Sequence, residues 1–96
     1  MINADTFVID REDIKNYRFF TTDVIDKIED RQSRYKDLYK ALILGNTRKG
    51  KVKIFFKTTE GNRYVETTVW GLTEGFVLLK RDTFIPVASI YEVSFF

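Results

Sequence analysis

The chain has 96 residues, of which 44% are hydrophobic and 16% aromatic, and this composition excludes an intrinsically disordered chain. It contains no cysteine and no histidine, which excludes disulfides, thiolate nucleophiles and the usual zinc ligands. The formal net charge of +2 is too small to indicate a partner by itself. We therefore expect one domain over residues 1–96, with no enzymatic activity, no metal and no cofactor.

The first 21 residues are predicted to form an extended arm with one or two short strand pairings. TFVID and NYRFF are both rich in β-branched or aromatic residues, and the charged residues between them are typical of a solvated turn. The sequence MINADTFVIDRED has neither the basic segment nor the apolar core of a signal peptide. Because no run of about 18 apolar residues occurs either, we expect a cytoplasmic protein that does not span a membrane.

One long helix is predicted over residues 22–45. Thr22 or Asp23 can cap its first turn, because a side-chain oxygen there accepts a hydrogen bond from a free N–H group. Gly45 tolerates the left-handed conformation that ends a helix. The apolar residues at three- and four-residue spacing are Ile25, Ile28, Tyr35, Leu38, Tyr39 and Leu42. We expect this stripe to pack on a sheet.

After Gly50 the pattern changes to a period of two, which predicts strands. In KVKIFFKTT, the apolar Val52, Ile54 and Phe56 alternate with Lys51, Lys53, Phe55 and Lys57, so one face of this strand should be buried. Turns at 60–62, 73–75 and 81–83 separate it from RYVETTVWGLT, FVLLK and FIPVASIYEVSFF. The last segment should hold a helical turn and a closing strand over 90–95.

Short strands joined by tight turns usually close on themselves, since closure removes exposed edges. We predict an α+β fold in which residues 50–96 form a small, strongly bent antiparallel β-barrel of four or five strands. The N-terminal arm (residues 1–21) and the helix (residues 22–45) pack on that barrel.

The segments GKVKIFFKTTEGNRYVETTVWGLTEGFVLLK and IPVASIYEV resemble the Sm-like family of small β-barrels. Gly50 precedes the first strand, Gly61 lies in the first hairpin, and Ile85 and Ile90 have the spacing of the closing segment. The resemblance covers residues 22–96 and implies the fold alone. The family's RNA-contacting motifs are not matched, because Thr73-Glu74-Gly75 and Ile85-Pro86 stand in their places.

The sixteen residues from Arg48 to Arg63 hold six basic residues and one acidic residue. Such a run suits RNA or single-stranded nucleic acid, with bases stacked on Phe55, Tyr64 or Trp70 and phosphates held by the basic side chains. The candidate nucleic-acid-binding residues are Arg48, Lys49, Lys51, Lys53, Phe55, Lys57 and Arg63.

Two other interpretations remain open. Lysines along an edge strand also prevent edge-to-edge aggregation, and Phe55 and Trp70 can be core or helix contacts. The terminal Phe95 and Phe96 indicate packing on a partner, of which a second copy is the simplest. We therefore predict a non-catalytic binding module, with RNA or single-stranded nucleic acid as the leading ligand. The alternative is a protein-interaction or self-associating structural module.

Overall fold

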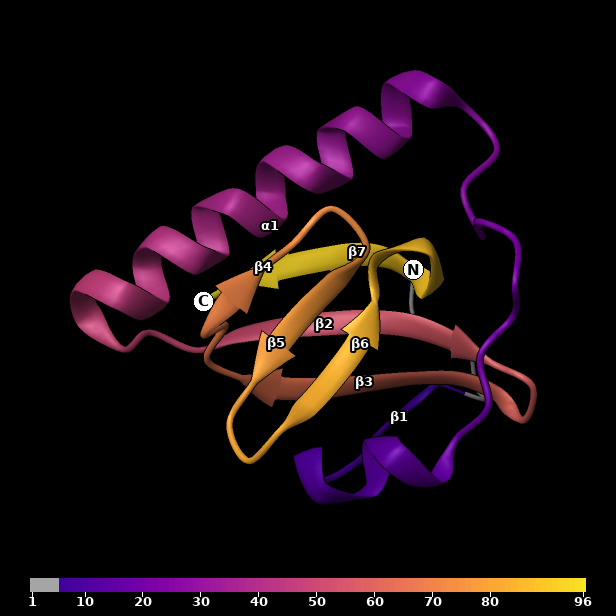
Figure 1. Ribbon diagram of the computed structural model, residues 1–96, viewed down its shortest axis with the longest axis horizontal. Coiled ribbons are helices and arrows are strands. Elements are labelled where there is room, and N and C mark those ends of the chain that lie inside the picture. The colour runs from indigo at the N-terminus through magenta and orange to yellow at the C-terminus, as the bar shows by residue number, and fades with distance from the viewer. Residues whose placement is uncertain (1–5) are drawn as a thin grey trace.

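The computed structural model describes residues 6–96, and this part of the chain contains one long helix and seven strands (Figure 1). The helix α1 covers Ile28–Arg48. The strands are β1 (Phe7–Val8), β2 (Val52–Thr58), β3 (Gly61–Thr67), β4 (Gly71–Leu72), β5 (Phe76–Leu79), β6 (Thr83–Pro86) and β7 (Ile90–Phe95). Two short 3₁₀ helices, η1 (Arg11–Asn16) and η2 (Val87–Ser89), complete the list. The predicted α+β class is confirmed.

The strands form two sheets. Sheet A has the order β1-β3-β2-β7, in which β2 is antiparallel to both neighbours and β1 is parallel to β3. Sheet B is the antiparallel meander β4-β5-β6. In Figure 1 sheet B lies in front of sheet A, and α1 crosses above both. The core contains Val52, Ile54, Phe56, Val65, Val77, Leu79 and Ile85.

The period-two pattern of the sequence predicted the strands well. Val52, Ile54 and Phe56 of β2 are fully buried, as the alternation in KVKIFFKTT requires. In the next run, RYVETTVWGLT, the alternating residues Val65, Thr67 and Val69 are buried. The helical turn η2 and the closing strand β7 also lie where they were predicted.

Within residues 6–96 the strands do not close into one barrel by hydrogen bonding, so the predicted closure is not confirmed. On one side, α1 spans from β7 of sheet A to β4 of sheet B. On the other side, η1 contacts both β6 and β3, and its Ile14 is fully buried. Helices therefore fill the gaps that strand pairing would have to close.

The helix is displaced along the sequence from its predicted position. It begins at Ile28, five residues after Asp23, whose carboxylate accepts the N–H of Ile25 and the side chain of Arg34 and does not cap the first turn. It ends at Arg48, where Lys49 adopts a left-handed conformation (φ 53°) and donates its N–H to the carbonyl of Gly45 at 3.0 Å. The left-handed residue thus comes after the glycine that was expected to supply it.

The predicted buried stripe of α1 is confirmed for Leu38, which is fully buried, and for Leu42, which packs on the core, but it is wrong for Ile28, Tyr35 and Tyr39. The buried residues are Arg34, Leu38, Ala41 and Gly45, whereas Ile28 is 64% exposed and Tyr35 and Tyr39 are also exposed. The reason is close approach: a Cβ on Gly45 would lie 2.3 Å from the carbonyl oxygen of Val69. Small residues let the helix backbone touch the strand segment, and the bulky flank stays outside.

The N-terminal arm is only partly as predicted. Phe7–Val8 pairs with β3, which confirms one short pairing, but NYRFF is not a strand, and residues 11–16 form η1. The arm prediction for residues 1–5 lies outside the described residues. None of the helices within residues 6–96 is long and apolar enough to cross a membrane.

Candidate nucleic-acid interface

The seven residues predicted to contact nucleic acid do not share one surface. Arg48 and Lys49 are exposed at the C-terminal end of α1, and Lys51 is exposed just before β2. The side chains of Lys53, Phe55 and Lys57 lie on the face of β2 opposite the core residues. Arg63 lies on β3, on the buried face that it shares with Val65.

Phe55 cannot stack on a base, because its side chain is only 3% exposed. Its ring is stacked on Tyr64 with 4.9 Å between ring centroids, and Tyr91 of β7 lies against it at 6.1 Å. The interpretation of Phe55 as a packing residue is therefore correct, and its predicted role in stacking on nucleic acid is not supported.

Arg63 is also engaged within the fold, since it is 7% exposed. Its guanidinium lies 3.9 Å from the ring centroid of Phe7, and its Nε donates to the Tyr17 hydroxyl at 3.3 Å. Its amino groups donate to the carbonyls of Asn62 at 2.8 Å and Glu60 at 3.2 Å. The residue fastens the N-terminal arm to the β2–β3 hairpin, so a phosphate does not reach it.

Lys53 and Lys57 are half-buried and have partners on the outer face of sheet A. The Nζ of Lys53 lies 3.9 Å from a Glu66 carboxylate oxygen and 5.8 Å from the Tyr64 ring centroid. The Nζ of Lys57 lies 5.9 Å from the Tyr91 ring centroid. Their stems cover apolar surface while their charges rest beside aromatic rings, which fits a solubilising role.

Lys49 and Lys51, in contrast, line a pocket that also contains an exposed aromatic ring. A pocket of about 390 Å³ lies between the end of α1 and the start of sheet B, and we call it the Trp70 pocket. Its lining residues are Gly45, Asn46, Lys49, Lys51, Thr68, Trp70 and Lys80. Trp70 is 54% exposed, and the Nζ of Lys80 lies 5.1 Å from the centroid of its ring.

Local backbone geometry builds this pocket. The left-handed Lys49 reverses the chain at the end of α1, and Gly50 donates its N–H to the carbonyl of Leu44 at 3.3 Å. The hydroxyl of Thr68 donates to the carbonyl of Lys49 at 3.3 Å, which joins the strand segment to the helix end. The backbone N–H of Trp70 donates to the carbonyl of Leu78 at 2.9 Å, and Trp70 is thereby held beside β5.

Sequence reasoning considered Trp70 as a stacking residue but missed Lys80. The signal was present, because the predicted turn at 73–75 folds the segment after β5 back beside Trp70. Asn46 also lines the pocket and was not among the predicted residues. The pocket thus combines three ammonium groups, one amide and one indole, with no carboxylate among its lining residues.

The chemistry of this lining suits a ligand that carries both a phosphate and an aromatic base. Comparison of the chain with protein-family models, with curated proteins and with solved structures gives no match. The assignment of a ligand class therefore rests on the geometry of the pocket.

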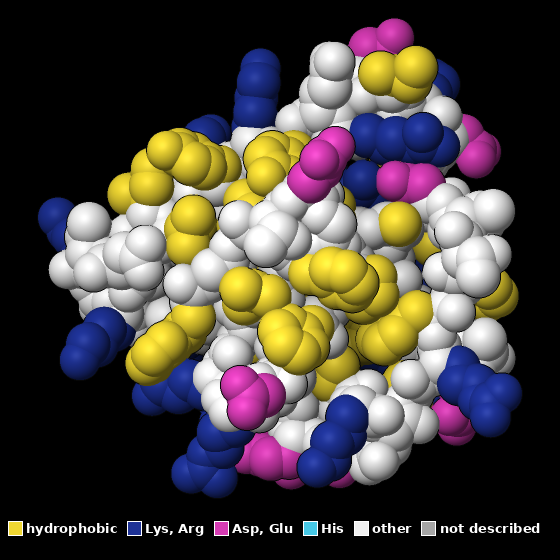
Figure 2. Space-filling view, viewed as in Figure 1, with side chains coloured by type: hydrophobic (Ala, Val, Ile, Leu, Met, Phe, Trp, Pro, Cys, Tyr) yellow, Lys and Arg dark blue, Asp and Glu magenta, His cyan; other side chains and the backbone are white. Residues whose placement is uncertain are grey.

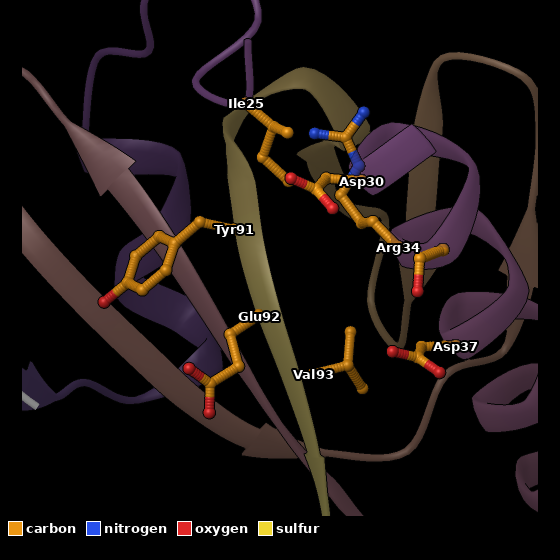
Figure 3. Close-up of a pocket in the computed structure, with 8 residues that line it drawn as sticks. Ile25, Asp30, Arg34, Asp37, Tyr91, Glu92 and Val93 are labelled. Atoms are coloured by element: carbon orange, nitrogen blue, oxygen red, sulfur yellow. The ribbon is translucent and has the colours of Figure 1, made fainter. Parts of the chain in front are cut away.

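A second pocket has carboxylates among its lining residues, which the Trp70 pocket does not (Figure 3). It has a volume of about 320 Å³ between α1 and β7 and is lined by Ile25, Asp30, Ser33, Arg34, Asp37, Tyr91, Glu92 and Val93. In Figure 3, Asp37 faces Val93 across the pocket, whereas the side chains of Tyr91 and Glu92 point to the other side of β7. Within residues 6–96 no group of three acidic side chains converges as a metal site would require. We assign this pocket no ligand.

Proposed function

We propose that this chain is a non-catalytic binding module whose Trp70 pocket holds single-stranded nucleic acid. One base stacks on Trp70, and the phosphates on either side are held by Lys49, Lys51 and Lys80. The observation that carries the proposal is a pocket lined by the half-exposed indole of Trp70 and by three lysines, with the Nζ of Lys80 at 5.1 Å from the ring centroid. Base–aromatic stacking contributes about 1–3 kcal/mol per base and tolerates any sequence.

Single-stranded ligands fit this geometry better than a duplex does. An indole can stack only on a base whose face is free, and such bases occur in single strands, loops and bulges. The pocket volume of about 390 Å³ lies within the range of roughly 300–1,000 Å³ that is usual for ligand pockets, and it suits a single nucleotide unit.

At the level of the fold, we propose that the strands form an incomplete barrel of the Sm-like kind. The chain runs from β3 into β4 and so connects sheet A, with the order β1-β3-β2-β7, to sheet B, with the order β4-β5-β6, and this connection supports the proposal. This arrangement brings the end of α1 against Trp70, which lies in the segment that connects β3 to β4.

Fluorescence gives a direct test, because Trp70 is the single tryptophan of the sequence. A short oligouridylate added at low salt should quench this fluorescence in a saturable way, and added salt should reverse the quenching. Anisotropy of a labelled oligouridylate measures the variants that lack this tryptophan. Trp70→Ala should weaken binding by roughly 5- to 150-fold, which corresponds to the loss of one stack. Trp70→Phe should retain most of the affinity.

The control is Phe20→Ala, which removes a similarly exposed aromatic ring from the segment before α1, outside the pocket. It should leave the affinity unchanged. A fluorescence that does not respond to the oligonucleotide at low salt, with no anisotropy change of a labelled strand, would refute the proposed function.

A further inference from the structure

A second surface of the molecule is apolar and exposed, and it lies next to the Trp70 pocket. It consists of Tyr35, Tyr39 and Ile43 on the outer flank of α1 and Phe76, Leu78 and Phe84 on the outer face of sheet B, and we call it the apolar face. Figure 2 shows hydrophobic side chains gathered over this part of the molecule, with most Lys and Arg side chains toward the edge of the view.

Contacts between the elements make this face continuous. The hydroxyl of Tyr35 donates to the carbonyl of Thr73 at 3.4 Å, which links the helix flank to sheet B. The rings of Phe76 and Phe84 meet edge to face with 6.4 Å between their centroids. A shallow hollow between them is lined by Thr73, Phe76, Leu78 and Phe84.

The exposed apolar area of this face is large enough to form the core of an interface. Phe76 is 48% exposed, Phe84 50% and Tyr39 54%. Tyr35 is 38% exposed, and since each of these four aromatic side chains has about 150–250 Å² to bury, the face offers on the order of 300–500 Å² of apolar surface. The largest apolar patch of a typical monomer covers about 300–600 Å² and is often functional, and this face lies in that range. A standard interface takes about 800 Å² from each partner, so this face would supply its core.

We infer that the apolar face is the contact between two copies of this chain, related by a two-fold axis. The charges along β5 favour a second copy. Acidic Glu74 precedes the strand and basic Lys80 follows it. When two such faces stack with their β5 strands antiparallel, Glu74 of each copy lies toward Lys80 of the other, and the apolar rows meet between them. A face that is complementary to itself in this way is the requirement for a two-fold dimer.

Sedimentation equilibrium of the chain alone, without nucleic acid, tests this inference independently of the proposed function. The chain should show a monomer–dimer equilibrium at micromolar concentrations. Phe84→Glu should weaken dimerisation by roughly 30-fold or more, as charge in the centre of an interface does. Tyr39→Glu on α1 tests the same face from another element, should the first variant fail to fold. Phe20→Glu, which places the same charge outside the face, should dimerise like the wild type.

The orientation is tested by exchanging charges. Glu74→Lys should weaken the dimer, and Glu74→Lys combined with Lys80→Glu should restore it. A wild-type chain that stays monomeric at all concentrations overturns the inference. Dimers of undiminished strength in both glutamate variants of the face also overturn it. Failure of the charge exchange to restore association overturns the antiparallel arrangement.

Discussion

Arg34 near the start of α1 grips the carboxylate of Asp23 with both amino groups. Its Nη1 donates to Oδ1 at 2.8 Å and its Nη2 donates to Oδ2 at 2.7 Å. Nη1 also donates to the carbonyl of Ile90 in β7 at 3.0 Å. This ion pair is bidentate, and bidentate pairs between arginine and a carboxylate are among the strongest charge-assisted hydrogen bonds in proteins. It joins the segment before the helix, the helix and the edge of sheet A.

The pair should make stability depend on pH in the acid range. Hydrogen bonding from Arg34 is the largest influence on Asp23 and holds the pKa of its carboxyl below the ordinary value of 3.8. A carboxyl with a lowered pKa stabilises the fold above its unfolded-state pKa, and that contribution is lost as the pH falls through the folded-state value. Urea unfolding at a series of pH values should show this loss. Asp23→Asn should flatten the dependence, and an unchanged profile would contradict the role of the pair.

Removing the side chain of Arg34 should lower the free energy of unfolding more than removing that of Arg31. Arg34→Ala leaves Asp23 partly buried without its main partner, and we expect a loss of about 3–5 kcal/mol in the free energy of unfolding. Arg31 also approaches Asp23, with its Nε at 3.5 Å from Oδ2, but its side chain is 41% exposed. Arg31→Ala should therefore cost about 1 kcal/mol. Equal losses from the two variants, measured by denaturant unfolding, would show that burial does not decide the energy.

The buried face of α1 can be tested in the same way. Leu38→Ala should cost about 2–5 kcal/mol, because the side chain is fully buried in the core. Ile28→Ala should change the free energy of unfolding by no more than about 0.5 kcal/mol, since Ile28 lies exposed at the first turn. The reverse order would contradict the burial of Leu38 and the exposure of Ile28.

The strands could be predicted from the sequence because the period of two assigns every residue of a strand to one face. The helix face could not, since apolar residues occupy both the buried line through Leu38 and the exposed flank through Tyr35 and Tyr39. Spacing does not distinguish these lines. What decides between them is the close approach at Gly45, and a glycine carries no hydrophobic signal. A buried arginine, Arg34, is likewise contrary to what charge alone would predict.

The candidate site could be predicted in part. The charge run indicated Lys49 and Lys51, and a hairpin turn could have added Lys80. The burial of Arg63 could not be foreseen, because the residues that cover it, Phe7 and Tyr17, belong to a distant segment of the chain. Exposure of an aromatic or basic side chain is thus set by the segments that cover it, which neither its own position nor its neighbours in sequence reveal.

Glycine at position 45 provides a further prediction. In Gly45→Ala the new methyl group would meet the carbonyl oxygen of Val69 at 2.3 Å, and backbone cannot swing aside as a side chain can. We expect a loss of about 1–3 kcal/mol, although alanine favours the helix. Gly75→Ala is the matched control, because no atom lies within 4 Å of the added carbon. Thermal unfolding of the two variants compares them, and an unaffected Gly45→Ala would mean that the helix can move away from the strand.

The salt dependence of nucleic-acid binding should separate the pocket lysines from the strand lysines. Binding that releases counterions weakens with salt, with a slope of about −0.7 per phosphate contact for single strands. Replacing Lys49, Lys51 and Lys80 together by Gln should therefore flatten the slope by up to roughly 2. Lys53→Gln with Lys57→Gln should leave the slope nearly unchanged, because these two side chains already rest beside Tyr64, Tyr91 and Glu66. Anisotropy of a labelled oligouridylate, titrated at several salt concentrations, measures both slopes. A larger effect of the strand pair would move the interface from the Trp70 pocket to the outer face of sheet A.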